Sequence, residues 1–254
     1  MMSIRQAGGG GGRSFVAVRQ WVPALNLVLL VSCGSLGFAQ AAPGPVSDPP
    51  LESMSPRWRQ AIVDTGADAA YLTETERQVV LELNKARTDP AEYAKRYLVP
   101  LRQYFRGRLF RVPGETAIST NEGIVPLDEC ITELQQTRPL APLEPRKGLS
   151  LAARDNAKDQ GKTGATGHTG KDGSTAVSRI NRYGTWDRTA GENIDYGNGT
   201  ARMIVVSLLV DDGVPSRGHR RNLLDKAFTL IGVAVGHHPV YRHMCVMDFA
   251  GAYR

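Results

Sequence analysis

The stretch "DDGVPSRGHRRN", from Asp211 to Asn222, combines two adjacent carboxylates, a Gly-Val-Pro bend and one histidine among arginines. It follows the apolar run "ARMIVVSLLV", residues 201–210. Thr200 precedes that run and is a good helix cap, and a run of this length between a cap and a proline stop favours a buried helix over a strand. We therefore expect a helix that ends at a polar bend, with His219 shortly after it.

The residues after this bend predict a β-hairpin. Apolar side chains alternate over 231–235 and again over 245–249, and a His-His-Pro turn separates the two runs. Alternation on both sides of a turn is typical of two antiparallel strands. Three histidines flank this turn, and we interpret them as part of a solvated turn rather than as a metal cluster: His237, His238 and His243.

The residues before the bend predict several helices. Thr73 and Glu76 form a capping box, and apolar residues then recur at helical spacing. Helices interleaved with a few strands near the C-terminus imply an α+β domain in which helices cover an antiparallel sheet. The expected helices span residues 74–87, 90–101, 128–136 and, with Ser150 as cap, 150–161.

Composition and charge limit the possible classes of protein. The chain has 254 residues with 41% hydrophobic content, enough for one domain with a real core. Its net charge of +6 suggests nucleic acid, but Arg5, Arg13 and Arg19 lie in the first 41 residues, which contain no acid. The remaining 28 basic and 25 acidic residues are nearly balanced. We therefore predict no nucleic-acid partner.

The first 41 residues predict an export signal. Arginines precede an apolar stretch over 22–38, and Ala39-Gln40-Ala41 is the small-x-small pattern of a signal-peptidase site. We expect a signal peptide over 1–41 and an exported protein, secreted or periplasmic. The alternative is a lipoprotein: Leu30-Val31-Ser32-Cys33 resembles a lipobox, and acylation of Cys33 would anchor the protein to a membrane.

The next segment predicts a linker before the folded domain. Residues 42–70 are rich in proline and small residues, which is typical of a flexible linker, and the domain is expected over 71–254. Cys130 and Cys245 remain in this domain. Two interpretations stay open for them: a disulfide, or two small buried hydrophobic side chains, which we favour slightly.

Three segments place a polar side chain beside glycine, where the backbone can expose it to a cleft. They are "GHTGKDGS" with His168, "GENIDYG" with Glu192, and the opening stretch with His219. We interpret all three segments as loops.

The order of these segments resembles the CAP superfamily of cysteine-rich secretory proteins, insect venom antigens and plant pathogenesis-related proteins. The resemblance covers roughly residues 72–253 and depends on "GENI", "GHRRN" and the closing "CVMDFA". Arg220-Arg221-Asn222 makes the chain similar to bacterial members. The resemblance implies a three-layer α-β-α sandwich with a small antiparallel sheet.

The resemblance also implies a central cleft. It assigns His168, Glu192 and His219 to three of four cleft positions. The fourth position matches Asp211 or Asp212 only loosely, because members with all four carry a glutamate on the preceding helix, and no glutamate follows Glu192 here. We take Asp211 as the weaker fourth member.

The cleft residues suggest two functions. His168 and His219 are candidate zinc ligands, and since catalytic zinc usually has three protein ligands, Glu192 or an aspartate would complete the set. The favoured function is non-enzymatic binding of an extracellular small molecule, lipid or peptide, a ligand class that comes from the resemblance alone. The alternative is a metal-assisted hydrolase, peptidase or esterase, with Glu192 as base or Ser174 or Ser216 as nucleophile.

Overall fold

The fold of this chain, given by a computed structural model, is described for residues 2–5, 14–17, 56–114 and 117–254. Three long strands form the centre of the main sheet: β7 (Trp186–Tyr196), β8 (Leu230–His238) and β9 (Arg242–Tyr253). Strand β9 lies between β7 and β8 and is antiparallel to both. The predicted hairpin is therefore confirmed, although both of its strands are longer than the alternating runs.

Strand β7 is the main element that the sequence did not predict. The stretch "GENIDYG" was expected to be a loop, but Glu192 lies near the middle of an 11-residue strand. Polar side chains occupy buried positions along β7, among them Asn193 and Asp195, so the usual alternation of apolar and polar residues is absent. The assignment of Glu192 to a loop was wrong for this reason.

Shorter strands complete the sheets. Beside β8, β6 (Glu144–Pro145) pairs in parallel. At the other edge, β2 (Ser14–Ala17) is parallel to β7 and antiparallel to β1 (Met2–Arg5). A separate small sheet contains β3 (Phe105–Arg106), β4 (Leu109–Phe110) and β5 (Ile118–Ser119).

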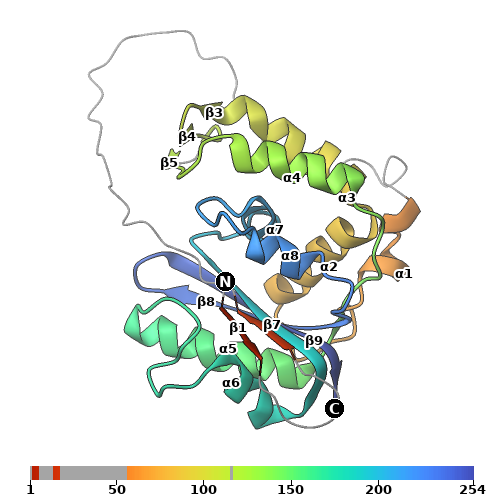
Figure 1. Ribbon diagram of the computed structural model, residues 1–254, viewed down its shortest axis with the longest axis vertical. Coiled ribbons are helices and arrows are strands. Elements are labelled where there is room, and N and C mark those ends of the chain that lie inside the picture. The colour runs from red at the N-terminus through yellow and green to blue at the C-terminus, as the bar shows by residue number, and fades with distance from the viewer. Residues whose placement is uncertain (1, 6–13, 18–55, 115–116) are drawn as a thin grey trace.

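Helices cover both faces of the main sheet, as Figure 1 shows. One layer contains α2 (Glu74–Thr88), α4 (Val125–Gln136), α7 (Ala201–Val210) and α8 (Gly218–Leu223). The other layer contains α5 (Lys147–Thr163) and α6 (Ala176–Tyr183). The expected α+β fold, a three-layer α-β-α sandwich, is confirmed.

Local capping signals located some helix starts correctly and missed others. Thr73 and Glu76 form the predicted capping box at the start of α2, and the Thr200 hydroxyl accepts from the backbone of Met203 at the start of α7. Ser150 is not a cap, because α5 begins at Lys147 and Ser150 is buried within it. After Asp89, the second expected helix is α3 (Pro90–Tyr93), then a π-helical segment, Ala94–Leu98, and a 3-10 segment, Val99–Tyr104.

The folded domain begins earlier than residue 71. A 3-10 turn (Pro56–Trp58) and α1 (Gln60–Val63) precede it, and Trp58 is 2% exposed. The Trp58 indole donates to the Lys85 carbonyl at 2.9 Å and stacks on Tyr97. The predicted flexible linker therefore does not extend over 56–70. Residues 18–55, which include the predicted cleavage site and Cys33, lie outside the described residues.

The two faces of the sheet have different cores. The larger core, on the side of α2 and α7, contains both Cys130 and Cys245, which are free and buried. The smaller cores, on the side of α5 and α6, are built mainly from small and aliphatic residues. Strand residues on this second side include Ala190, Ile194, Ala234, Val246 and Ala250.

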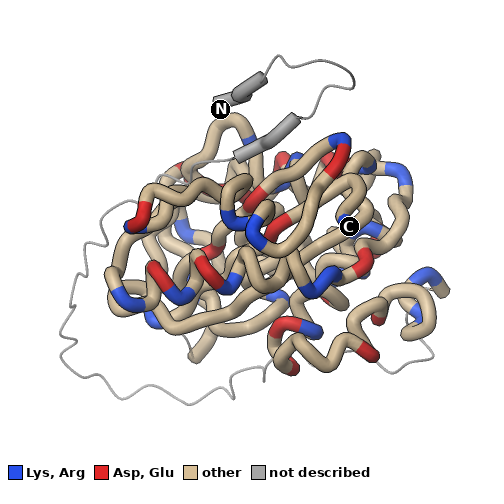
Figure 2. The backbone as a smooth tube through the Cα atoms, turned by 90° about the horizontal axis from the view of Figure 1, so that it is seen from below, with Lys and Arg blue, Asp and Glu red and all other residues tan. Residues whose placement is uncertain are grey.

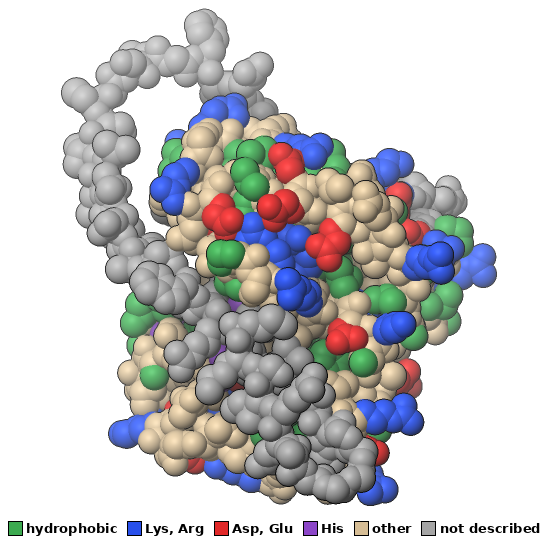
Figure 3. Space-filling view, viewed as in Figure 1, with side chains coloured by type: hydrophobic (Ala, Val, Ile, Leu, Met, Phe, Trp, Pro, Cys, Tyr) green, Lys and Arg blue, Asp and Glu red, His purple; other side chains and the backbone are tan. Residues whose placement is uncertain are grey.

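Charges of both signs are distributed over the surface. Figure 2 shows basic and acidic residues interspersed along the chain, and the face in Figure 3 mixes basic, acidic and hydrophobic side chains. This distribution fits the near balance of charges beyond residue 41. Among the described residues, none of the helices combines the length and the apolar character that a membrane span requires.

Candidate functional site

His168 lies in the loop between α5 and α6 and contacts the central sheet. The loop leaves α5 at Gly164, which has a φ of 69°, and Gly167 has a φ of 100°, so two residues before His168 are in the region that favours glycine. His168 Nδ1 lies 2.7 Å from Glu192 Oε1, and the His168 side chain is 13% exposed. The loop thus brings together two of the predicted site residues.

Glu192 is fully buried, and both of its oxygens are engaged. His168 occupies Oε1, and Arg179 of α6 binds Oε2 at 2.7 Å. Arg179 also donates to the His168 carbonyl from both terminal nitrogens, at 3.2 Å each. The buried cation therefore holds the carboxylate and the loop that carries the histidine.

A second carboxyl group faces Glu192. Asp248 of β9 pairs with Glu192 across the sheet and is fully buried. Among the described residues, no hydrogen-bond donor reaches either oxygen of Asp248. Burial, with the adjacent Glu192 carboxylate, raises the pKa of Asp248 well above its usual range. Burial beside Glu192 therefore disfavours the charged form of Asp248.

His219 and Asp211 form the other pair of predicted site residues. Asp211 ends α7 in the left-handed conformation, with a φ of 59°. Its Oδ1 lies 2.5 Å from His219 Nδ1, and its Oδ2 accepts from the His219 backbone at 2.8 Å. Both side chains are 1% exposed, and in the described part of the chain no hydrogen-bond partner reaches His219 Nε2. His219 is on helix α8, so its assignment to a loop was wrong.

Strand β7 connects the two pairs. The Asn193 amide donates to the His219 carbonyl at 3.0 Å, and Asn222 donates to the Asn193 side chain at 2.8 Å. Because side chains alternate along a strand, Glu192 and Asn193 point to opposite faces of the sheet. The structure therefore brings the four predicted residues together as two pairs joined through β7. The single cleft that contains all four stays a prediction.

The donor set falls short of what a preformed metal site requires. Within the described ranges, no three His, Cys, Asp or Glu side chains are grouped so that they could hold an ion. Glu192 already uses both oxygens on Arg179 and His168, which argues against it as the third zinc ligand. The residues thus do not form a preformed three-ligand zinc site.

Other candidates from the sequence have structural contacts. Asp212 accepts from the backbone amides of Asn121 and Glu122, so it anchors the segment before α4 and does not contact His219 through these bonds. Arg217 pairs with Glu122 and Glu129.

Arg220 and His238 are both buried. Arg220 is buried, pairs with Glu133 and donates to the carbonyls of Leu209 and Val210. His238 is fully buried, so the interpretation of a solvated turn was wrong for it. The neighbouring His243 is exposed, and His237 is also on the surface.

Sequence reasoning missed Arg179 and Asp248. Arg179 lies on α6, a helix that was not predicted, and nothing in its local pattern marks it as a partner of Glu192. Asp248 did carry a signal, because it is the charged residue on a strand face that it shares with the apolar Val246 and Ala250. A charged residue at such a position predicts a buried polar contact.

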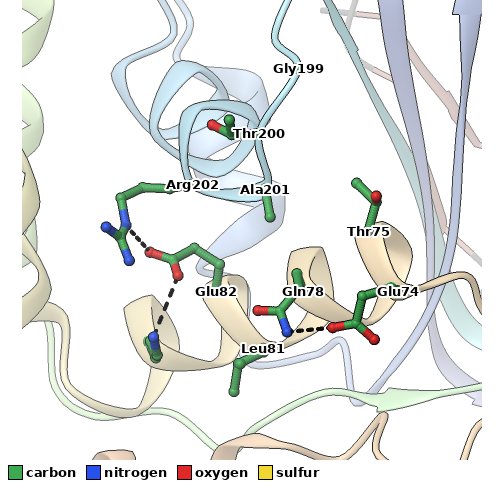
Figure 4. A pocket seen from close by; sticks show the side chains of 10 residues that line it. Glu74, Thr75, Gln78, Leu81, Glu82, Gly199, Thr200, Ala201 and Arg202 are labelled. Carbon is green, nitrogen blue, oxygen red and sulfur yellow. Dashed lines mark hydrogen bonds and ion pairs between the residues drawn. The ribbon is translucent and has the colours of Figure 1, made fainter. Parts of the chain in front are cut away.

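The pocket in Figure 4 lies away from these pairs. It is open, has a volume of about 340 Å³ and lies between the starts of α2 and α7. Glu82 there binds Arg202 at 2.9 Å and Lys85 at 3.6 Å, so its charge is compensated. None of the four predicted site residues lines this pocket.

Comparison with known proteins gives the family. Two solved structures are similar, and the first is an outer surface protein from Borrelia burgdorferi, with 23% identity, TM-score 0.36 and coverage of 44% of this chain and 78% of that chain. The second is an extracellular protein containing an SCP domain from Bacillus anthracis, with 25% identity, TM-score 0.34 and coverage of 49% of this chain and 37% of that chain. No curated protein matches the chain. The model of the CAP, or cysteine-rich secretory protein, family matches residues 82–249, and the chain therefore belongs to this family.

Proposed function

We propose that the chain is an exported CAP-family binding protein that contacts an extracellular ligand through the partly exposed imidazole of His168 and, once the structure around it opens, the buried imidazole of His219. The observation that supports this most directly is that a buried carboxylate holds each Nδ1, at 2.7 Å and 2.5 Å. Such a contact fixes the ring and directs its Nε2 edge away from the carboxylate. Export rests on the signal pattern of residues 1–41.

The ligand class follows from what an oriented imidazole can bind. Because a carboxylate only accepts, Nδ1 carries the proton of each neutral ring, and Nε2 is then an acceptor that suits a hydroxyl or N–H group of a small molecule, lipid or peptide. Arg179 neutralises Glu192, so the His168 side of the site does not repel an anionic group strongly. No membrane attachment is part of this proposal unless Cys33 is acylated.

Zinc is a second ligand that the two histidines could hold. Histidines that bind metals commonly donate their other nitrogen to a carboxylate, which is the arrangement of both pairs here. Bound zinc would supply Lewis-acid chemistry. With two imidazoles and no third protein ligand, binding is expected to be weak and to decrease at acid pH, because protonation of either ring competes with the metal.

Calorimetric titration of zinc into the full chain tests the two-histidine site. We expect His168→Ala and His219→Ala each to weaken binding about tenfold or more, and the double variant to abolish it. His237→Ala, which changes a surface histidine of the hairpin, is the control and should bind as the parent does. Zinc binding to the double variant with the parent's affinity would contradict the proposal.

The hydrolase alternative has one supporting observation. The His168–Glu192 contact is the arrangement that orients a histidine as a general base. A panel of esters and peptides with and without zinc tests this function. Zinc-dependent turnover in the parent that is lost in Glu192→Gln would replace the binding proposal, and absence of turnover across the panel supports binding.

A further inference from the structure

The loop that carries His168 is held by side chains from two strand ends. Backbone atoms of three loop residues, Ala165, Gly167 and His168, bind side chains outside the loop. The donor for His168 is Arg179, as described above. The contacts of Ala165 and Gly167 come from His238 and Tyr196, which have no part in the proposed function.

His238, the last residue of β8, makes the contact to Ala165. Its Nε2 lies 3.0 Å from the Ala165 carbonyl, so Nε2 carries the proton that is donated. Its Nδ1 then accepts from the backbone amides of Val240 and Tyr241, at 3.2 Å each. Both ring nitrogens of this fully buried side chain are therefore used, one toward the hairpin turn and one toward the His168 loop.

Tyr196, the last residue of β7, makes the contact to Gly167. Its hydroxyl accepts from the Gly167 amide at 2.8 Å and lies 2.7 Å from the Gln160 side-chain oxygen. Gln160 in turn donates to the Gly167 carbonyl at 2.5 Å. The rings of Tyr196 and His238 pack edge to face with centroids 5.4 Å apart, so the two supports also contact each other.

The loop needs such supports because of its sequence. Gly164 and Gly167 give the backbone freedom that most residues lack, and the Glu192 contact alone restrains only the side chain of His168. A ring that must meet a ligand has to be fixed through its backbone as well. The contacts at Ala165 and Gly167 supply this restraint shortly before His168.

We propose that His238 is a positioning residue of the candidate site: by donating to Ala165 and packing on Tyr196, it fixes the loop that presents His168. The assignment rests on the proposed function, in which His168 contacts the ligand. It gives His238 a role that its place in the hairpin turn alone would not require.

Two variants separate the two nitrogens of His238. His238→Gln places an amide donor near the position of Nε2, so it keeps a group that can reach Ala165 and loses the acceptor for the turn. His238→Asn does the reverse, because its shorter side chain places an oxygen near Nδ1. The readouts in the full chain are the imidazole NMR signals of His168, assigned with His168→Ala, and the hydrogen-exchange rate of the Gly167 amide.

We expect His238→Asn to shift the His168 signals and raise Gly167 exchange at least about tenfold, while His238→Gln retains most of the parent behaviour. His237→Asn, at the neighbouring surface histidine, should change neither readout. Unchanged His168 signals in His238→Asn would overturn the proposal. It would also be overturned if His238→Asn and His238→Gln changed both readouts equally and in proportion to their loss of stability.

Tyr196→Phe provides a test if a His238 variant does not fold. It removes only the hydroxyl and keeps the ring that packs on His238. Faster Gly167 exchange with shifted His168 signals supports the part of the proposal in which His238 acts through Tyr196, and parent-like behaviour contradicts that part. None of these readouts uses a ligand, so a failed zinc titration would reject the two-histidine zinc site without affecting this result.

Discussion

The two histidine–carboxylate pairs share one contact but differ in how the chain builds it. Asp211 and His219 are 8 residues apart, whereas His168 and Glu192 are 24 residues apart and come from a loop and a central strand. Asp211 binds both the ring and the backbone of His219, so it closes the turn between α7 and α8. Glu192 binds the ring of His168 and is itself held by Arg179.

Because of this difference, the two pairs have different roles, although each joins a histidine to a carboxylate. The Asp211–His219 pair is part of the folded turn, and neither side chain can leave without exposing a buried donor or acceptor. The His168 ring lies on a glycine-rich loop, is partly exposed, and contacts a carboxylate that keeps a second partner when the ring is absent. The first pair should therefore govern stability, and the second should adjust more easily to a ligand.

The largest expected effect comes from Asp211→Ala. The substitution leaves the buried His219 ring nitrogen and backbone amide without acceptors and puts alanine at a positive φ, so the free energy of unfolding should fall by about 3 to 5 kcal/mol. Denaturant unfolding measures this loss. Asp211→Asn keeps an acceptor oxygen and tolerates the left-handed conformation, and it is the matched control with a smaller expected loss.

A loss below about 1 kcal/mol for Asp211→Ala would show that the turn between α7 and α8 forms without the aspartate. The pair at His219 would then not be a structural clamp. The contrast between the two pairs would disappear with it.

An intermediate effect is expected from Asp195, the second buried carboxyl on β7. Asp195 accepts from Asn198 at 2.8 Å, and burial raises its pKa to about 7 against the opposing hydrogen bonds from Asn198 and Ser207. Glu192, on the same strand, has Arg179 as a partner instead. Comparing Asp195 with Glu192 tests how much the buried Arg179 guanidinium stabilises a buried carboxylate.

The direction of the pH dependence of stability follows from the raised pKa of Asp195. The folded chain keeps the Asp195 proton up to about pH 7, whereas the unfolded chain releases it near pH 4, so stability from this group is full below about pH 4 and is lost as pH rises to about 7. Between pH 5 and pH 8 the loss should be about 2 to 3 kcal/mol. Asp195→Asn should reduce this loss, and Asp187→Asn, at an exposed acid of the same strand, should not. An identical pH dependence in parent and Asp195→Asn would contradict the assignment.

The sequence predicted those parts of the fold that depend on local signals. The capping box at Thr73, the capped apolar run of α7 and the alternation in β8 and β9 each reflect interactions within a few residues. Strand β7 was missed because its buried polar residues do not alternate with apolar ones, and Asn193, for example, is compensated by His219 and Asn222, which are distant in sequence. A pattern of hydrophobicity cannot register such partners.

The same limit applies to the candidate site. His168, Glu192, His219 and Asp211 were all named from glycine-flanked motifs and the family resemblance, and the structure pairs them. The pairing itself was not predictable, because it requires Arg179 from an unpredicted helix and the register of β7 with β9. His238 was misinterpreted for a related reason: adjacent histidines in a turn do not show which of them points inward.

The smallest expected effect comes from His168→Ala, and the same substitution at His219 provides the contrast. Loss of the His168 ring removes one partly exposed contact and leaves Glu192 bound to Arg179, so the cost should be about 1 kcal/mol. His219→Ala removes a fully buried ring, opens a cavity and leaves the ring acceptor Oδ1 of Asp211 unpaired, so a loss of about 3 kcal/mol is expected. Denaturant unfolding of both variants at one pH measures the two losses in free energy of unfolding and therefore their ratio. Equal losses would mean that the His168 loop is as deeply part of the fold as the α7–α8 turn, and a ligand could not then displace His168 more easily than His219.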